Sequence, residues 1–199
     1  MKLPSLLFLF CLFVLLPAFP SYPATDHAPP ASVADQPILH IPLRIHLGNS
    51  GRSPGEWLPI LEEINFIWLS QAGICFAMHT VIHDEELENG FDLWFELTIP
   101  EWNGYFTGAH DMHVRDNPDL QPARRSASSS AARTAAHEIG HALGLAHRQD
   151  SDDNLMRSKT YGWQLDEDET ARARTAAGQL NGAGTGSLPC GPPAIHSTP

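Results

Sequence analysis

Residues 137–147 read HEIGHALGLAH, and this stretch decides how the rest of the chain is interpreted. His137 and His141 are four residues apart in a predicted helix, so both imidazoles lie on one face and can reach the same cation. Glu138 lies beside that face, where its carboxylate can contact a water at the cation. Gly144 is suited to ending the helix in the left-handed conformation, after which the chain folds back and brings His147 to the same point.

Three neutral imidazoles that leave a fourth position open form the ligand set of a catalytic zinc, whereas structural zinc sites close that position with a protein ligand. Zinc in such a site polarises a peptide carbonyl and lowers the pKa of a water ligand. Glu138 would take the proton from the water and pass it to the leaving amine. Solvated histidines on a helix surface would explain neither the glutamate nor the glycine. A zinc protein that binds without catalysing would not need Glu138. We therefore predict one zinc held by His137, His141 and His147, with Glu138 as general base and acid.

The same residues resemble the metzincin clan of zinc peptidases, whose signature is His-Glu-x-x-His-x-x-Gly-x-x-His, and the run from Ala135 to His147 is most similar to the matrixin branch. The segment Asn154-Leu155-Met156 resembles the tight turn that places a methionine beneath the zinc in this clan, which assigns that role to Met156. Arg148 stands where matrixins usually have a small hydroxyl residue, so the branch stays open. The resemblance implies a zinc metalloendopeptidase that hydrolyses peptide bonds in proteins or peptides.

The resemblance also implies the fold, which is of the mixed α/β (α+β) class. It has a twisted five-stranded sheet with a backing helix and an active-site helix, then a small C-terminal subdomain with the Met-turn and a final helix. An extended substrate would pair with an edge strand above the zinc, for which residues 106–110 are the candidate. The expected substrate-binding residues on this strand are Gly108, Ala109 and His110. The segment from Arg157 to Leu165 should shape the pocket for the side chain after the scissile bond, through Tyr161 and Trp163.

The periodicity of apolar residues predicts elements in the same order as this fold. An alternating strand begins at Ile41, and a helical stripe runs from Ser53-Pro54 to Gly73. Further strands are expected over 74–82, 93–99 and 112–115, followed by helices over 131–143 and 166–177. The serines between Ser126 and Ser130 are candidate N-caps for the first of these two helices.

The two ends of the chain differ in composition from its centre. Lys2 precedes an apolar run that is short for a membrane span and typical of a secretory signal peptide, although a membrane anchor is the alternative. We expect a signal peptide over 1–24, with cleavage after Ala18 or Ala24, and a linker or short pro-segment over 25–37. The catalytic domain is expected over 38–177, followed by a disordered Gly/Pro-rich tail over 178–199.

The formal net charge of -11 argues against a nucleic-acid binder, which would carry a basic patch. We expect a secreted or periplasmic monomer, with no membrane partner after signal cleavage. Export would permit a disulfide between Cys75 and Cys190, a pairing that the sequence leaves open. His110 and His113 are interpreted as surface histidines rather than as a second zinc site. Calcium is a further possible cofactor, at the acidic residues Asp116, Asp119, Asp150, Asp152 and Asp153.

Overall fold

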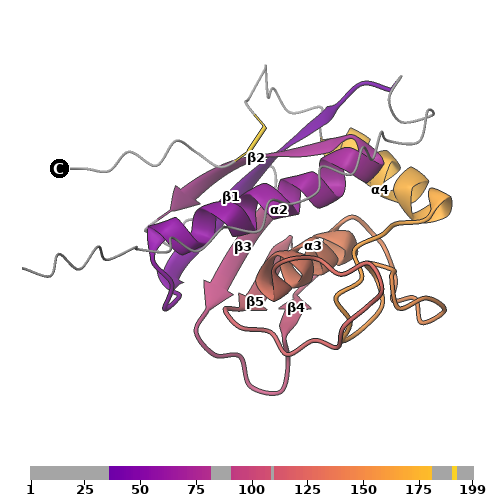
Figure 1. Cartoon of the computed structure of the whole chain (residues 1–199). Helices are drawn as coiled ribbons and strands as arrows, with labels where there is room; N and C mark the ends of the chain where they lie inside the picture. The colour runs from indigo at the N-terminus through magenta and orange to yellow at the C-terminus, as the bar shows by residue number, and fades with distance from the viewer. Residues whose placement is uncertain (1–35, 82–90, 109, 181–189, 192–199) are drawn as a thin grey trace, which may run out of the picture.

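A five-stranded mixed sheet with the strand order β2-β1-β3-β5-β4 forms the base of the structure (Figure 1). The computed structural model describes residues 36–81, 91–108, 110–180 and 190–191. Four neighbouring strands run parallel, and β4 alone runs antiparallel, against β5. The strands are β1 (Leu39–Asn49), β2 (Ile74–Val81), β3 (Phe91–Glu96), β4 (Gly104–Phe106) and β5 (Asp111–Arg115). The predicted mixed α/β fold with five strands is thereby confirmed.

Three helices complete the described fold: α2 (Pro54–Ala72), α3 (Ser130–Ala142) and α4 (Glu167–Leu180). Helices α2 and α3 lie on the same face of the sheet, and α4 lies at the end of α2 (Figure 1). Helix α2 begins at a capping box, in which the backbone N–H of Ser53 donates to Glu56 Oε2 at 2.8 Å, and it ends at Gly73 with φ 59°. Both of its ends lie where the sequence predicts them.

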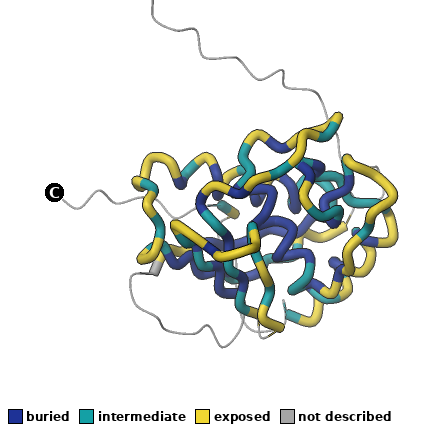
Figure 2. Tube along the Cα trace, turned by 90° about the horizontal axis from the view of Figure 1, so that it is seen from below, coloured by how far each residue is buried: buried dark blue, intermediate teal, exposed yellow. Residues whose placement is uncertain are grey.

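The hydrophobic core lies between the sheet and the helices (Figure 2). Alternate residues of β1 point toward α2, so Ile41, Leu43 and Ile45 are fully buried. The helix meets them with a stripe of large side chains that includes Ile64 and Trp68, both of them also fully buried. This core fixes α3 against β5 and β4, and the active-site stretch is carried by α3.

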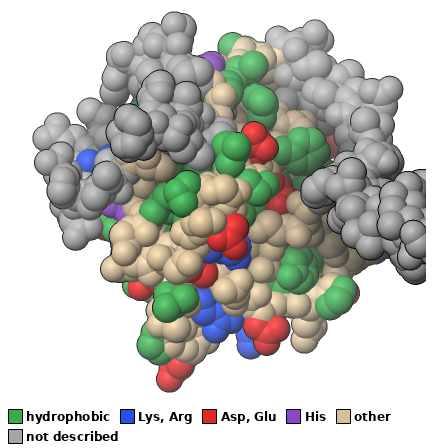
Figure 3. Space-filling view, turned by 60° about the vertical axis from the view of Figure 1, so that its left-hand side comes forward, with side chains coloured by type: hydrophobic (Ala, Val, Ile, Leu, Met, Phe, Trp, Pro, Cys, Tyr) green, Lys and Arg blue, Asp and Glu red, His purple; other side chains and the backbone are tan. Residues whose placement is uncertain are grey.

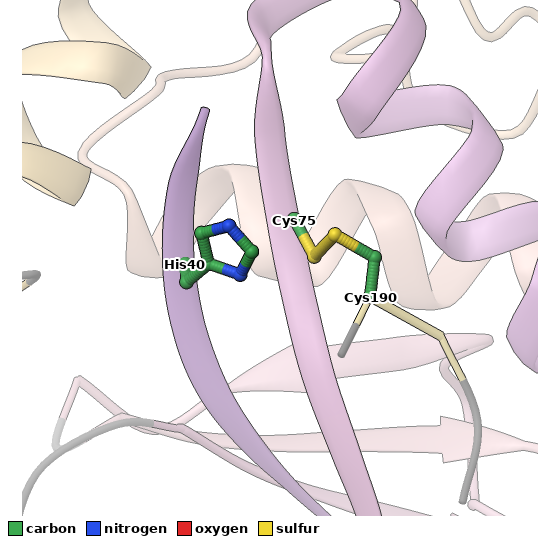
Figure 4. A group of neighbouring side chains, drawn as sticks. All are labelled: His40, Cys75 and Cys190. Carbon is green, nitrogen blue, oxygen red and sulfur yellow. A yellow bond between two sulfur atoms is a disulfide. The ribbon is translucent and has the colours of Figure 1, made fainter. Parts of the chain in front are cut away.

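Cys75 and Cys190 form a disulfide, which answers the question that the sequence left open (Figure 4). The bond holds residues 190–191 beside β2, where the backbone N–H of Met78 donates to the carbonyl oxygen of Gly191 at 3.3 Å. His40 lies next to the pair on β1. Because both sulfurs are used in the disulfide, this group of three side chains does not form a metal site.

Removing this disulfide should destabilise the protein without disturbing the metal centre. The bond closes a loop with a sequence separation of 115 residues, so Cys75→Ser should allow the unfolded chain many more conformations. We expect the free energy of unfolding to fall by about 2–3 kcal/mol in a urea titration. Reduction of the wild type should give the same loss, and an unchanged urea midpoint would contradict this prediction.

Some boundaries differ from those that the sequence predicts. Strand β3 is shifted toward the N-terminus and ends at Glu96, so residues 97–99 lie beyond it. Helix α4 continues to Leu180, so residues 178–180 are helical, and residues 190–191 are held by β2. The expected signal peptide lies outside the described residues, as do most of the linker and most of the tail.

The surface of the described part carries mixed charge. On the face in Figure 3, basic side chains form small groups beside acidic ones, and hydrophobic side chains are scattered between them. Among the described helices, none is both long and apolar enough to cross a membrane.

Candidate metal centre

The three predicted metal ligands meet at one point. The Nε2 atoms of His137, His141 and His147 are separated by 3.1, 3.2 and 3.1 Å. Ligands at about 2.0–2.1 Å from a tetrahedral zinc are about 3.3 Å apart, so the triangle has the size that this ion requires. No other group of three such side chains in the described part of the chain is comparable, because the group at His40 contains the disulfide.

Hydrogen bonds orient two of the rings. His137 Nδ1 lies 2.7 Å from the carbonyl oxygen of Leu155, and His141 Nδ1 lies 2.8 Å from that of Leu145. A carbonyl oxygen accepts only, so each Nδ1 carries the proton and each Nε2 is left with a free lone pair. Lone pairs that face one another at this distance repel unless a cation lies between them. The donor set therefore fits a bound metal ion.

Burial favours the neutral form that metal binding needs at two of the ligands, His137 and His147. Desolvation lowers the pKa of His137 well below its usual value, and it also lowers the pKa of the more exposed His147. The nearby Arg133 guanidinium acts in the same direction on both rings. Both imidazoles are thus neutral near pH 7, and a metal ion displaces no proton from them.

The backbone brings the third ligand back as the sequence predicts. Helix α3 begins after Ser129, whose hydroxyl accepts from the N–H of Ala132 at 3.2 Å. Gly144 has φ 80°, and the N–H of Leu145 donates to the carbonyl oxygen of Gly140 at 2.9 Å. The reversal after Ala142 is what turns His147 toward the helix.

Glu138 is 5% exposed and lines the same cavity as the three histidines. Burial raises its pKa to about 8, against a smaller opposing effect of Arg133. No described residue donates a hydrogen bond to its carboxylate, so both oxygens are free to meet a water. A dication at the neighbouring imidazoles would favour the charged form of this carboxyl.

Met156 lies directly beneath the helix that carries the ligands. A Cβ atom on Gly140 would be 2.5 Å from Met156 Sδ, so the methionine packs against the helix between His137 and His141. The turn itself is held by Asn154, whose Oδ1 accepts from the N–H of Met156 at 2.6 Å and whose Nδ2 donates to Glu169 at 2.7 Å. The last helix thereby anchors the turn under the metal centre.

Arg133 connects the active-site helix to the segment after this turn. It is only 2% exposed, and its guanidinium donates to the carbonyl oxygens of Leu155, Arg157 and Gly162. The carbonyl of Leu155 therefore accepts from both Arg133 and His137. Desolvation lowers the pKa of this arginine to about 10, so it remains charged at neutral pH.

Arg148, at the position where the chain departs from matrixins, forms ion pairs with Asp150 and Asp166. Its backbone N–H donates to the carbonyl oxygen of Met156 at 3.0 Å. The residue after the third histidine thus links the metal loop to the start of α4.

A cavity of about 800 Å³ opens over the histidines and Glu138. Strand β4 and the residues before it form one side, and residues 119–120 and 158–159 form other parts of its wall. Trp102 and Tyr105 line it as large exposed aromatic side chains, at 62% and 39% exposure. Trp102, Tyr105, Gly104 and Arg133 were not predicted from the sequence as residues of the site.

The described members of the predicted substrate-binding set, Gly108, His110, Tyr161 and Trp163, lie outside this wall. Gly108 and His110 follow β4 with φ 91° and 70°, and Ala109 between them lies outside the described residues. Tyr161 and Trp163 belong to the expected segment, but that segment meets the cavity through Ser158 and Lys159. Trp163 instead packs against the core and against Phe66, with ring centres 5.6 Å apart.

The edge strand is β4, which begins two residues before the predicted segment. Its Gly104 touches α3 so closely that an added Cβ would lie 2.9 Å from Glu138 Oε1, Thr134 Cγ2 and the carbonyl oxygen of His113. Strand β4 can therefore approach the carboxylate of Glu138 only because Gly104 has no side chain.

Gly104→Ala should impair activity more than it impairs metal binding. The added methyl group would push Glu138 from its position, and displacements of this order cost about tenfold or more in rate. We expect kcat/KM to fall while zinc content stays the same. Gly48→Ala is the matched strand control, because nothing lies within 4 Å of its added Cβ. Equal kcat/KM for the two variants would contradict the role of Gly104.

The further metal sites considered in the sequence do not form in the described residues. His113 is stacked between Trp94 and Tyr105, and its Nδ1 pairs with Glu96 Oε1 at 2.6 Å, so it is not simply a surface histidine.

Calcium is not supported by the acidic residues. Asp116 accepts hydrogen bonds from Ser50 and Gly51, and Asp119 is not part of any group that could hold a metal. The other three carboxylates pair with arginines rather than with one another: Asp150 with Arg148, Asp152 with Arg157 and Asp153 with Arg124.

Comparison with known proteins agrees with this site. A family model described as matrixin matches residues 78–174. Among solved structures, archaemetzincin from Methanopyrus kandleri is similar, with a TM-score of 0.51 and 14% sequence identity over 69% of this chain and 95% of that one. A search of curated proteins found no match. The matched region covers just under half of the chain and contains all three histidines, Glu138 and Met156, and the family and fold likenesses together support a metzincin-like zinc metallopeptidase.

Proposed function

We propose that the protein is an exported endopeptidase that cleaves peptide bonds in proteins or peptides, with one zinc ion held by His137, His141 and His147. The observation that carries this proposal is the convergence of the three Nε2 atoms beside the carboxylate of Glu138 at the floor of one cavity. Zinc bound there supplies a Lewis acid that polarises the scissile carbonyl and acidifies water.

The residues of the chain supply the remaining steps. Glu138 accepts the proton of the attacking water and later donates it to the leaving amine. His137 and His141 keep their orientation because their Nδ1 protons are donated to carbonyl oxygens. Strand β4 presents its backbone at the edge of the sheet, where an extended substrate can add as a further strand. Because such pairing needs no free peptide end, we infer cleavage within chains.

The disulfide supports the proposal of export. Cys75 and Cys190 form a disulfide. Disulfides persist in oxidising compartments and are rare in the cytosol. The Met1–Ala24 segment would direct the chain there as a signal peptide. A thiol assay on protein recovered from its native compartment tests this, and free thiols at both cysteines would contradict export.

The activity can be tested with an internally quenched peptide that is blocked at both ends. We expect purified protein to contain about one zinc per chain and to cut the peptide internally. A chelator should abolish cleavage, and one equivalent of zinc should restore it. Cleavage that survives complete removal of metal would contradict the proposal, as would a fully zinc-loaded protein that cuts neither this peptide nor an unfolded protein.

A further inference from the structure

One wall of the cavity carries positive charge that no described carboxylate neutralises by an ion pair. Arg133 and Lys159 both line the cavity, together with Ser158 and Leu120. Neither cation forms an ion pair with a carboxylate of the described residues. Glu138 attracts the charge of Arg133 without forming an ion pair with it, and an anion that reaches the guanidinium in a partly dry cavity is bound more strongly than in water.

The guanidinium of Arg133 is fixed but not fully used. Its Nε donates to the carbonyl oxygen of Gly162 at 3.0 Å, and its Nη2 donates to those of Leu155 and Arg157. Its Nη1 makes no hydrogen bond with a described residue. Carbonyl oxygens hold the group in place but carry no net charge, so a carboxylate ligand can still form a direct ion pair with Arg133.

Lys159 stands two residues after Arg157, to whose carbonyl Arg133 is bonded. It has φ 65°, a left-handed conformation that favours glycine or asparagine over lysine. The N–H of Gln121 donates to its carbonyl oxygen at 2.7 Å, and the segment is thereby held in this conformation. Non-glycine residues in such conformations gather at functional sites, and here the strained residue places an exposed ammonium group at the cavity.

The neighbouring hydroxyl group also favours an anion. Ser158 Oγ accepts from Gln149 Nε2 at 3.2 Å, so its own proton remains free to be donated. None of the three cavity carboxylates forms an ion pair with Arg133 or Lys159. Glu138 is at the metal centre and interacts with Arg133 without an ion pair, whereas Glu101 and Asp119 are exposed to solvent. This wall therefore offers a guanidinium, an ammonium and a hydroxyl donor, which together match a carboxylate.

We propose that this wall selects substrates with an acidic side chain after the scissile bond, and that Arg133 and Lys159 are the specificity-determining residues. The inference rests on the proposed function and names the substrate class of the same site. Arg133 is one helical turn before His137, so an acidic side chain bound on this wall would lie next to the metal centre. Its carboxylate would receive hydrogen bonds from Arg133 Nη1, from the ammonium of Lys159 and from the hydroxyl of Ser158.

Pairs of quenched peptides that differ by a single residue test the proposal. One peptide has Glu after the cleaved bond and the other has the isosteric Gln, and mass spectrometry identifies the bond that is cut. We expect kcat/KM to be about tenfold or more higher for Glu in the zinc-loaded wild type. Lys159→Asn should lower this Glu/Gln ratio about threefold, since asparagine tolerates the backbone conformation and removes the charge.

Arg124→Asn is the control, because this arginine is exposed and lies outside the cavity wall; its ratio should equal that of the wild type. Arg133→Gln should abolish the preference. Because this variant can fail to fold, its thermal unfolding is measured alongside, and Lys159→Asn keeps the test independent of it. A wild-type ratio within about twofold of one overturns the inference, as does a ratio that Lys159→Asn leaves unchanged. Zinc-loaded protein that cuts no peptide overturns the proposed function itself.

Discussion

Glu138→Gln should lower kcat/KM by about 10³-fold or more while the protein still binds zinc. The amide keeps the shape of the carboxyl group but cannot accept the proton of the attacking water. Of the described carboxylates that line the cavity, Glu138 alone is buried, whereas Glu101 and Asp119 are exposed, so no buried neighbour can take over this role. The metal ligands are untouched because the glutamate lies beside them and is not one of the three.

Two measurements separate this loss from a loss of structure. Zinc content and the thermal unfolding midpoint should both match those of the wild type, since burial favours a neutral side chain at this position. Glu167→Gln in the first turn of α4 is the control, because this glutamate is exposed and outside the cavity. Wild-type cleavage rates in Glu138→Gln would remove the glutamate from the mechanism.

Gly162→Ala should be the most destabilising small substitution in the segment after the Met-turn. An added Cβ would lie 2.6 Å from the carbonyl oxygen of Asp153 and even closer to that of Asp152. Backbone atoms cannot rotate away as a side chain can, so the segment must move. The carbonyl oxygen of Gly162 accepts a hydrogen bond from Arg133 Nε, so the movement would also loosen this buried arginine.

We expect this variant to lose about 3–4 kcal/mol of unfolding free energy, at the upper end of overpacking effects. The contrasting variant is Gly178→Ala in α4, where nothing lies within 4 Å of the new methyl group. Alanine is the better helix former by about 1 kcal/mol, so this second change should stabilise the protein. If urea titrations gave the same midpoint for both variants, the close packing of Gly162 would be refuted.

The site residues that the sequence predicts are those whose positions follow from spacing along one short segment of the chain. His137, His141 and Gly144 follow from helix periodicity and from the conformational needs of a helix end. The ends of α2 could be predicted for the same reason, since Ser53-Pro54 and Gly73 are local signals.

The residues that could not be predicted act through partners far along the chain. Arg133 contacts carbonyls that are 22–29 residues away, and no local pattern shows where those carbonyls lie. A signal was nonetheless present, because Arg133 is one turn before His137 and so shares the face of the metal ligands. Gly104 belongs to a strand of only three residues, which is too short to show an alternating pattern.

The same limit explains the misplaced edge strand. Residues 106–110 are the expected edge strand, but Gly108 and His110 adopt positive φ angles, which end the extended conformation. Residues 104–106 pair with β5 instead, and the close packing of Gly104 against α3 places the strand there.

The disulfide also makes the two edges of the sheet unequal. An exposed edge strand is a template on which any extended chain can pair, including a second copy of the same protein. Residues 190–191, which the disulfide holds beside β2, cover part of that edge, whereas the outer edge of β4 has no partner strand within the described residues. Two molecules that associated through β4 would each cover the surface on which the other receives its substrate, so self-association by this route would be self-inhibition.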